Sequence, residues 1–394
     1  MKARRILLEL FDAALRAVDG RASVDRFLRQ VNLPAPVEIV AVGKAASAMA
    51  RGAFDALGTK VERMLVITKD GHTDPALDNL PRVRQLQSSH PMPDTRSFAH
   101  GAELEERVRA LPDAAIPLFL ISGGSSSLVE ALRDGVTLDD VFALNVHALA
   151  SGWDIARLNA ERARLSRIKG GGIARLLGGR RALALFVSDV PGDDPDIIGS
   201  GLLGRDGGVA DGVERHVIAN VEGAVRAAQD AARDRGLELE ALPARFDGDA
   251  AVLAEEFVAR LRACECHGLV WGGESTVNLP PRHGHGGRNT HVALAAARLM
   301  RAGEPLTILA AGTDGTDGPT SDAGAIVDAD SIERATLAGV DIERAFREFD
   351  SGTALEAAED LVHTGPTGTN VGDILIGIKH SAASPRGQHW PRML

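Results

Sequence analysis

Five short apolar runs, each ending in a polar loop that contains glycine or aspartate, constrain the fold of this chain most strongly. The runs cover residues 37–42, 117–121, 182–187, 268–271 and 306–311. Apolar runs of this length that alternate with helical segments are typical of α/β proteins with a largely parallel sheet. Ligands of such proteins bind beyond the carboxyl ends of the strands, so we expect the chemistry in the loops that follow these runs.

Helical spacing of apolar residues predicts a first helix over residues 7–18 and two further helices over residues 138–150 and 154–165. A length of 394 residues indicates two domains. Residues 221–255 are rich in alanine, arginine and glutamate and contain few residues typical of loops, so we place the transition between the two domains there. The predicted domains are residues 1–240, a Rossmann-like α/β/α domain, and residues 241–394, a smaller α/β domain.

The charge pattern argues against nucleic acid or a membrane as partner. Lys and Arg total 44 against 54 Asp and Glu, a net charge of −10, and the basic residues are scattered. No apolar run reaches the roughly 18 residues of a membrane helix. Cys264 and Cys266 are too close for a relaxed disulfide and lack further zinc ligands, which indicates reduced thiols. We therefore expect a cytoplasmic protein that binds small molecules. The sequence leaves open whether the protein forms a homodimer.

The loop Ser122-Gly123-Gly124-Ser125 is a candidate anion site. It offers backbone N–H groups and hydroxyls at the start of a helix, which suits a phosphate or carboxylate. An ordinary helix cap is the alternative. Lys44 follows the first apolar run directly and could reach a phosphate there, although a single lysine is commonly only solvated.

A second candidate anion site precedes the helical run at residues 292–300. The loop there contains Gly286, Gly287, Arg288 and Asn289. An arginine at a helix start suits phosphate because its planar fork bonds two oxygens. A flexible loop with a surface arginine is the alternative.

Two acidic loops follow apolar runs and are candidate magnesium sites. One contains Asp189 and Asp193, and the other contains Asp314 and Asp317. Magnesium commonly takes one or two protein carboxylates and bridges to substrate phosphates. Asx turns are the alternative explanation for such loops.

Two nucleotide-binding motifs are excluded. The chain contains no G-x-x-x-x-G-K-[ST] sequence of P-loop enzymes. Residues 199–204 fit G-x-G-x-x-G, but Arg205-Asp206-Gly207-Gly208 follows them where a dinucleotide-binding motif continues into a helix. We interpret that match as chance.

With these loops in order, the chain resembles the ATP-dependent glycerate 2-kinases that carry a C-terminal MOFRL domain, some of which bear the older name hydroxypyruvate reductase. The resemblance rests on short segments in family order between about residues 40 and 375. They are Val42-Gly43-Lys44-Ala45-Ala46, His90-Pro91-Met92-Pro93-Asp94, Ile121-Ser122-Gly123-Gly124-Ser125, Ser166-Arg167-Ile168-Lys169-Gly170-Gly171, Ser188-Asp189-Val190, Gly192-Asp193-Asp194, Gly272-Gly273-Glu274, Gly286-Gly287-Arg288-Asn289, Gly312-Thr313-Asp314-Gly315, Asp317-Gly318-Pro319-Thr320 and residues 364–370.

The resemblance implies a two-domain α/β enzyme with its active site in the cleft between the domains. It implies phosphorylation of D-glycerate to 2-phospho-D-glycerate, with ATP and Mg²⁺ as cofactors. Lys44 and Arg288 match the residues regarded as catalytic in the family. The matching segments also add Lys169, Thr369 and Asn370 to the predicted substrate and phosphate site.

We therefore predict that Lys44 and Arg288 stabilise the transferring phosphoryl group while residues 122–125 hold a carboxylate or phosphate. The four aspartates bind magnesium, and one of them, for which we name Asp189, accepts the proton of the hydroxyl group.

The chain departs from the family pattern at two places. Gly201-Leu202-Leu203 replaces Gly-Pro-Thr, and Thr290-His291 replaces Gln-Glu after Arg288. The second change removes a carboxylate, so we expect it to affect metal binding or substrate preference near Arg288. An NAD(P)H-dependent hydroxypyruvate reductase and a non-catalytic binder of sugar acids or nucleotides are the alternative functions.

Overall fold

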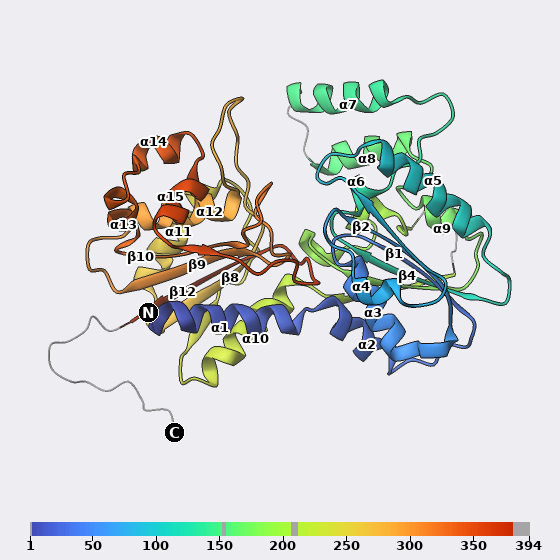
Figure 1. Cartoon of the computed structure of the whole chain (residues 1–394), viewed down its shortest axis with the longest axis horizontal. Coiled ribbons are helices and arrows are strands. Elements are labelled where there is room, and N and C mark those ends of the chain that lie inside the picture. The colour runs from blue at the N-terminus through green and yellow to red at the C-terminus, as the bar shows by residue number, and fades with distance from the viewer. Residues whose placement is uncertain (1, 152–154, 206–211, 381–394) are drawn as a thin grey trace. The chain divides into compact units, whose positions relative to one another are not determined.

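The computed structural model describes residues 2–151, 155–205 and 212–380, which pack into two compact units (Figure 1). The parallel-sheet unit comprises Val18–Asn220 with Gly368–Asn370. The mixed-sheet unit comprises Met1–Ala17, Val221–Thr367 and Val371–Leu394. The chain therefore passes between the two units four times.

The parallel-sheet unit contains six strands in the order β3-β2-β1-β4-β5-β6, and every neighbouring pair is parallel. The strands are β1 (Val37–Val42), β2 (Val61–Lys69), β3 (Val83–Ser88), β4 (Ile116–Ser122), β5 (Ala182–Val187) and β6 (Val213–Ala219). The helices are α2 (Gly20–Leu28), α3 (Ala46–Leu57), α4 (Pro75–Asp78), α5 (Thr95–Arg109), α6 (Ser125–Leu128), α7 (Leu138–Ala150), α8 (Ile155–Leu165) and α9 (Gly172–Leu176). Three 3₁₀ turns are η1 (Gly58–Lys60), η2 (Pro191–Asp193) and η3 (Ile198–Gly201).

Burial on both faces explains why the central strands of this sheet read as continuous apolar runs. Every residue of β1 and β5 is buried. Val40 and Val42 of β1 share one core with residues of α5 and α9, while α3 packs against β1, β2 and β4. Helices on both faces of a parallel sheet leave its carboxyl edge as the place where loops gather.

The mixed-sheet unit contains six strands in the order β11-β10-β9-β12-β8-β7. The strands are β7 (Leu239–Ala241), β8 (Gly268–Gly273), β9 (Leu306–Gly312), β10 (Gly324–Asp328), β11 (Leu361–Val362) and β12 (Asp373–Lys379). Only β7 and β8 are parallel neighbours, whereas β12 runs antiparallel between β8 and β9.

Helices cover both faces of the mixed sheet (Figure 1). They are α1 (Lys2–Ala17), α10 (Val221–Arg233), α11 (Ala250–Ala263), α12 (Arg288–Leu299), α13 (Ser331–Leu337), α14 (Ile342–Arg347) and α15 (Ser351–Ala357). In Figure 1, α1 and α10 lie on one side of the strands and α11 and α12 lie on the other.

The predicted α/β class is confirmed, and the five apolar runs form β1, β4, β5, β8 and β9. The predicted helices correspond to α1, α7 and α8, although Asp154 lies outside the described residues. The expected parallel pairing holds for the first sheet and is wrong for most of the second. Strands that are buried on both faces have the same continuous apolar sequence whether their neighbours are parallel or antiparallel. The sequence pattern therefore does not distinguish a parallel sheet from a mixed one.

The compact units divide the chain differently from the predicted domains 1–240 and 241–394. Helix α10 packs against α1 and against β7 and β8, so residues 221–240 belong with the second sheet. The first helix also belongs to that unit. Within the described ranges, none of the helices combines the length and apolar character needed to cross a bilayer.

Candidate active site

The carboxyl ends of β1 and β4 lie side by side where the strand order of the parallel sheet reverses direction. From β1 the chain proceeds outward to β2 and β3, and from β4 it proceeds the other way to β5 and β6. Open α/β sheets bind ligands at this switch point. Here the two loops that meet are Gly43-Lys44 and Ser122-Gly123-Gly124.

Direct hydrogen bonds hold these two loops together. The backbone N–H of Lys44 donates to the carbonyl of Gly123 (3.0 Å), and the N–H of Ala45 donates to Oγ of Ser122 (3.0 Å). Gly43 has a φ of 134°, and a Cβ atom there would lie 2.1 Å from Oγ of Ser122. Only glycine allows this approach, so the segment Gly43-Lys44 is fixed against the serine loop.

The hydroxyls of Ser122 and Ser125 make hydrogen bonds with the backbone. Both residues are fully buried, and Oγ of Ser125 donates to the carbonyls of Val42 (3.0 Å) and Ser122 (2.5 Å). Helix α6 is only four residues long, so it cannot supply the dipole of a full helix. These contacts fix Gly123 and Gly124 in place, and the anion-binding role of the loop stays a prediction.

Polar side chains from four segments gather around Gly123 and Gly124. A Cβ atom on Gly123 would lie 1.7 Å from Oδ2 of Asp189 and 2.2 Å from Nδ2 of Asn370. One on Gly124 would lie 3.0 Å from Cγ of Lys44 and 3.2 Å from the ring of His90. The predicted residues Lys44, Asp189 and Asn370 are thus brought together.

The last family segment enters this group through side-chain hydrogen bonds. Nδ2 of Asn370 donates to Oδ2 of Asp189 (2.9 Å). The hydroxyl of Thr369 is buried and donates to the carbonyl of Val18 (2.7 Å). Asn370 therefore positions the Asp189 carboxylate, while the hydroxyl of Thr369 holds its own segment to Val18, and the ligand role of Thr369 stays a prediction.

Asp193, one of the four predicted magnesium ligands, has a buried carboxylate oxygen without a hydrogen-bond partner in the described structure. Asn220 donates to its Oδ2 (2.5 Å), and its Oδ1 is buried without a hydrogen-bond partner in the described structure. The residue also has a φ of 52°, which an aspartate adopts more readily than most residues.

The described part of the chain holds no group of three or more His, Cys, Asp or Glu side chains that could enclose a metal ion. Magnesium suits such a site because it keeps several waters and needs only one or two protein carboxylates.

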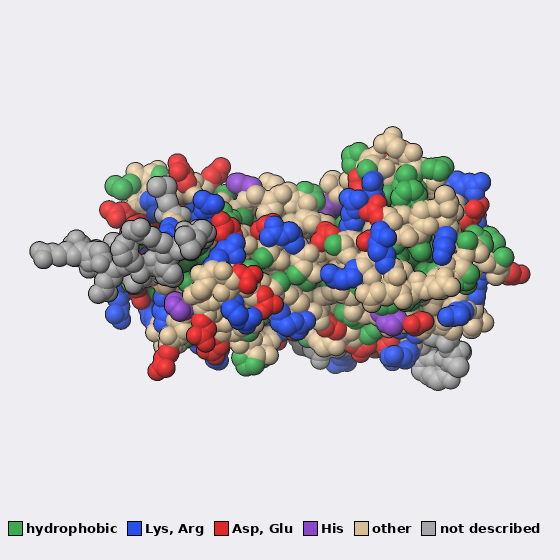
Figure 2. All heavy atoms as spheres, turned by 90° about the horizontal axis from the view of Figure 1, so that it is seen from below, with side chains coloured by type: hydrophobic (Ala, Val, Ile, Leu, Met, Phe, Trp, Pro, Cys, Tyr) green, Lys and Arg blue, Asp and Glu red, His purple; other side chains and the backbone are tan. Residues whose placement is uncertain are grey.

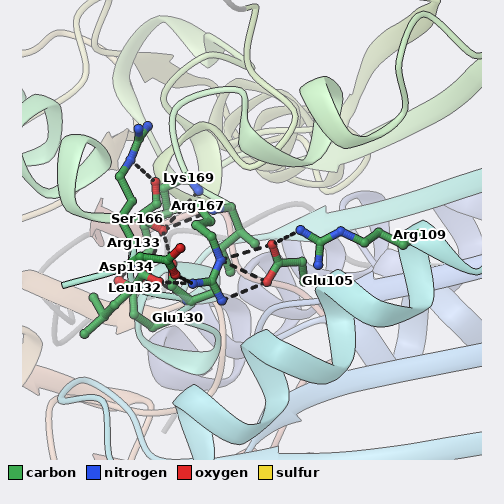
Figure 3. Close-up of polar contacts among 11 residues, drawn as sticks. Glu105, Arg109, Glu130, Leu132, Arg133, Asp134, Ser166, Arg167 and Lys169 are labelled. Atoms are coloured by element: carbon green, nitrogen blue, oxygen red, sulfur yellow. Dashed lines mark hydrogen bonds and ion pairs between the residues drawn. The ribbon is translucent and has the colours of Figure 1, made fainter. Parts of the chain in front are cut away.

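Lys169 lies in a separate pocket of the same unit. Its Nζ is 2.5 Å from Oε2 of Glu130, and both side chains are almost completely buried (Figure 3). Ser126, Arg162 and Ser200 also line this pocket.

In the mixed-sheet unit, Arg288 is anchored by a strand that begins at the site edge. Asp373 opens β12 and lies in register with Gly273 of β8 and Gly312 of β9. The Nε and Nη2 atoms of Arg288 donate to the two oxygens of Asp373 (2.6 and 2.9 Å), and Nη1 lies 3.0 Å from Glu274. These contacts involve three of the five N–H groups of the guanidinium and fix the direction of its plane.

Asp317 caps helix α12. Its Oδ1 accepts the backbone N–H of Asn289 (2.9 Å), and its Oδ2 accepts that of Thr290 (2.7 Å). Burial raises the pKa of Asp317 to about 6, although these N–H groups favour the charged form. A Cβ atom on Gly287 would lie 2.4 Å from this carboxylate. A glycine at this position therefore leaves the space in which Asp317 caps the helix.

Other predicted residues of this loop also have structural partners. Nδ2 of Asn289 donates to Asp373 (3.1 Å) and Asp317 (3.3 Å). Gly286 has a φ of 145° and packs against Ser351. Oδ1 of Asp314 accepts the N–H of Thr316 (2.9 Å), which is the Asx turn considered above. In the structure Asp314 is thus a turn residue and Asp317 a helix cap, and their role as magnesium ligands stays a prediction.

The sequence departure at Thr290-His291 lies in the core. The hydroxyl of Thr290 completes the cap of α12 by accepting the N–H of Gly287 (2.8 Å). The His291 ring stacks between Phe346 and Phe349, with ring centroids 4.6 Å from each. It is 4% exposed, and burial lowers its pKa to about 4. The His291 side chain therefore packs inside the unit and supplies no group for metal binding.

The sequence analysis assigned no role to five residues near these sites: His90, Glu130, Arg162, Ser200 and Asp373. His90 lies in one of the segments on which the family resemblance rests, and this segment could have identified it as a site residue. Asp373 precedes a strand, whereas we searched the loops that follow strands. On the face drawn in Figure 2, the described acidic and basic side chains are interspersed, without the basic stripe typical of nucleic-acid binding.

The strand order and the polar loops at its switch point place the parallel-sheet unit among the doubly wound α/β proteins. Family models identify the chain further. The model of a domain of unknown function, DUF4147, matches residues 6–227, and that of the MOFRL family matches residues 267–373.

Relatives with names agree with these matches. D-glycerate 2-kinase of Thermotoga maritima is 32% identical over 95% of this chain and 98% of its own length. A protein of Agrobacterium vitis, whose name suggests a hydroxypyruvate reductase, is 35% identical over 96% of this chain and 95% of its own. The crystal structure of glycerate kinase from T. maritima superposes with a TM-score of 0.82, covering 96% of this chain and 100% of that one. The chain belongs to the glycerate 2-kinase family that carries the MOFRL domain.

Proposed function

We propose that this protein phosphorylates the 2-hydroxyl of D-glycerate with ATP, giving 2-phospho-D-glycerate and ADP. The observation that carries the proposal is the gathering of Lys44, Asp189 and Asn370 around Gly123 at the switch point. It occurs in a chain that aligns over nearly its full length with the D-glycerate 2-kinase of T. maritima.

Phosphoryl transfer requires little covalent chemistry from the protein, so positioned charges do most of the work. The 2-hydroxyl oxygen forms a bond to the γ-phosphorus, and the bridging oxygen leaves on ADP with its electron pair. The hydroxyl proton passes to the carboxylate of Asp189 and from there to solvent. We assign Lys44 and Arg288 to the stabilisation of the charge on the transferring group.

Asp193 is the residue we assign to magnesium, because its buried Oδ1 has no protein partner in the described structure. When bound, the ion would neutralise phosphate oxygens of ATP. Asn220 would keep the carboxylate in place through its hydrogen bond to Oδ2. Asp189 is then the carboxylate that we assign to the base.

The direct test couples product formation to enolase without phosphoglycerate mutase. Enolase then gives a signal only if the phosphate is on the 2-position. We expect a signal that depends on D-glycerate, ATP and magnesium together. Formation of ADP without the enolase signal would contradict the position of transfer, and absence of ADP would contradict the kinase.

The reductase alternative lacks a dinucleotide site in the described structure. Residues 198–201 form a 3₁₀ turn that packs against Ser125 and Gly170, and no helix begins in the described residues that follow up to β6. We therefore expect no NADH oxidation with hydroxypyruvate. We also place the protein in the cytoplasm, where ATP is available.

A further inference from the structure

We propose that the pocket around Lys169 binds the carboxylate of the acceptor acid, and that Glu130 is a positioning residue for it. This inference rests on the proposed kinase function and names the substrate subsite. The pocket measures about 100 Å³, and its walls come from the His90–Asp94 segment, from α6 and α8, and from Lys169 and Ser200.

The Lys169–Glu130 pair is built into the fold by further hydrogen bonds. Oε1 of Glu130 accepts the hydroxyl of Ser166 (2.6 Å) and the backbone N–H of Ala131 (3.0 Å). Oε2 is therefore the oxygen left for Lys169 (Figure 3). Glu130 is 6% exposed and Lys169 is 5% exposed, yet both line the pocket. A buried ammonium held by one carboxylate oxygen keeps donor capacity for a ligand.

The charged side chains of the pocket suit an anion. Lys169 and Arg162 are cations, and Glu130 is the single anion among the lining residues. Because one oxygen of Glu130 holds the ammonium of Lys169, Lys169 is the group to which we assign the carboxylate.

Two hydroxyls on the pocket wall provide further polar groups. Oγ of Ser126 and Oγ of Ser200 lie 2.6 Å apart, and both residues line the pocket. Ser200 adopts a left-handed φ of 56°, which a residue with a side chain keeps only where the surroundings impose it. Those surroundings are the Lys169 loop, because the N–H groups of Gly170 and Gly171 donate to the carbonyls of Ser200 (3.0 Å) and Gly201 (2.7 Å).

Size separates the acceptor from the nucleotide. A volume of about 100 Å³ suits a three-carbon acid and is well below the roughly 300 Å³ at which pockets for larger ligands begin. Apolar groups of Met92, Val141 and Leu165 close the remaining walls. A triphosphate chain is too large and too highly charged for this space.

The test measures the KM values for D-glycerate and for ATP in the double variant Lys169→Met/Glu130→Gln. Removing both charges together avoids an unpaired buried ion, which would threaten folding. We expect the KM for D-glycerate to rise about 30-fold while the KM for ATP changes less than about 2-fold. Ser126→Ala, which leaves the ion pair intact, should raise the KM for D-glycerate about 5-fold.

Lys60→Met is the matched control. Lys60 lies at the opposite edge of the same sheet, where β2 begins, and donates to the carbonyl of Leu33 (3.0 Å). It should leave both KM values unchanged. A rise in the KM for ATP with an unchanged KM for D-glycerate in the double variant would overturn the inference and assign the pocket to a nucleotide phosphate.

Direct binding separates this inference from the proposed function. Calorimetry with D-glycerate alone should give heat of binding in the wild-type protein and none in the double variant. If the wild type binds D-glycerate through this pocket but forms no ADP, the kinase proposal fails and the subsite stands. If the wild type forms 2-phosphoglycerate and the double variant keeps its KM for D-glycerate, the subsite fails and the kinase stands.

Discussion

The two sheets present their candidate catalytic cations in different ways. Lys44 follows a strand of a wholly parallel sheet and meets Gly123, which follows the neighbouring strand. Arg288 begins a helix, and Asp373, the first residue of an antiparallel strand, holds it. The strands of a parallel sheet all end at one edge, so the loops that follow them meet there, whereas an edge of a mixed sheet also contains residues that precede strands. The residues at the edge of a parallel sheet can therefore be predicted from their order in the sequence. Those at the edge of a mixed sheet can be predicted only once the pairing of the strands is known.

The largest effect should come from removing either cation. We expect Lys44→Met and Arg288→Met each to lower kcat for 2-phosphoglycerate formation about 10³-fold, because each loses a charge that faces the transferring group. Steady-state kinetics with the enolase assay measures this, and Lys60→Met is again the control. A variant that keeps more than about a tenth of the rate would contradict the role of that cation.

Substitutions of Asp189 and of Asp193, both in the 188–194 loop, should cause different kinds of kinetic defect. Asp189→Asn should lower kcat about 10²-fold at any magnesium concentration, because it removes the base. Asp193→Asn should instead raise the magnesium concentration needed for half-maximal rate about 10-fold. Titrating magnesium in both variants measures the difference. Asp314→Asn is the comparison from the other unit, and an equal magnesium defect there would contradict the assignment of Asp193.

Substitution of Asp373, which anchors Arg288, should lower kcat more than substitution of Glu274, the second ionic partner of Arg288. Asp373→Asn removes a buried bidentate partner, so we expect kcat to fall about 30-fold as the guanidinium loses its fixed direction. Glu274→Gln changes a carboxylate that is 48% exposed, and we expect less than about a 3-fold change. Equal effects of the two variants would show that the edge strand does not position the arginine.

The smallest effect concerns stability. The pKa of His291 is about 4 in the folded protein against 6.5 for an ordinary histidine, so the unfolded chain binds the proton first. Stability should therefore fall as pH drops from 6.5 to 4, by about 3 kcal/mol from this group.

Urea unfolding of the wild type and of His291→Phe across this range measures the difference in slope. Asp317, whose pKa is raised to about 6, acts in the opposite direction in both proteins and cancels from the comparison. Parallel pH dependences of the two proteins would contradict the burial of a neutral His291.

The parallel-sheet unit was the more predictable part of the molecule. Its strands β1, β4 and β5 read as apolar runs because both faces are buried, and Lys44 and Asp189 followed them directly. The backbone hydrogen bonds of the Ser122 and Ser125 hydroxyls were not predictable, because a Ser-Gly loop has the same sequence whether Oγ faces a ligand or bonds to the backbone. Glu130 and Ser200 were not found, since their meeting with Lys169 depends on tertiary contacts between distant loops.

The measurement that tests the account most directly is the phosphoryl-transfer rate of Lys44→Met, Arg288→Met and the double variant, followed in single turnover with D-glycerate and ATP. If both cations stabilise one transferring group, their effects are not independent, and the double variant should lie within about 10-fold of the slower single variant. If the two losses multiply, to about 10⁶-fold, the two cations do not act on the same group and the account is contradicted.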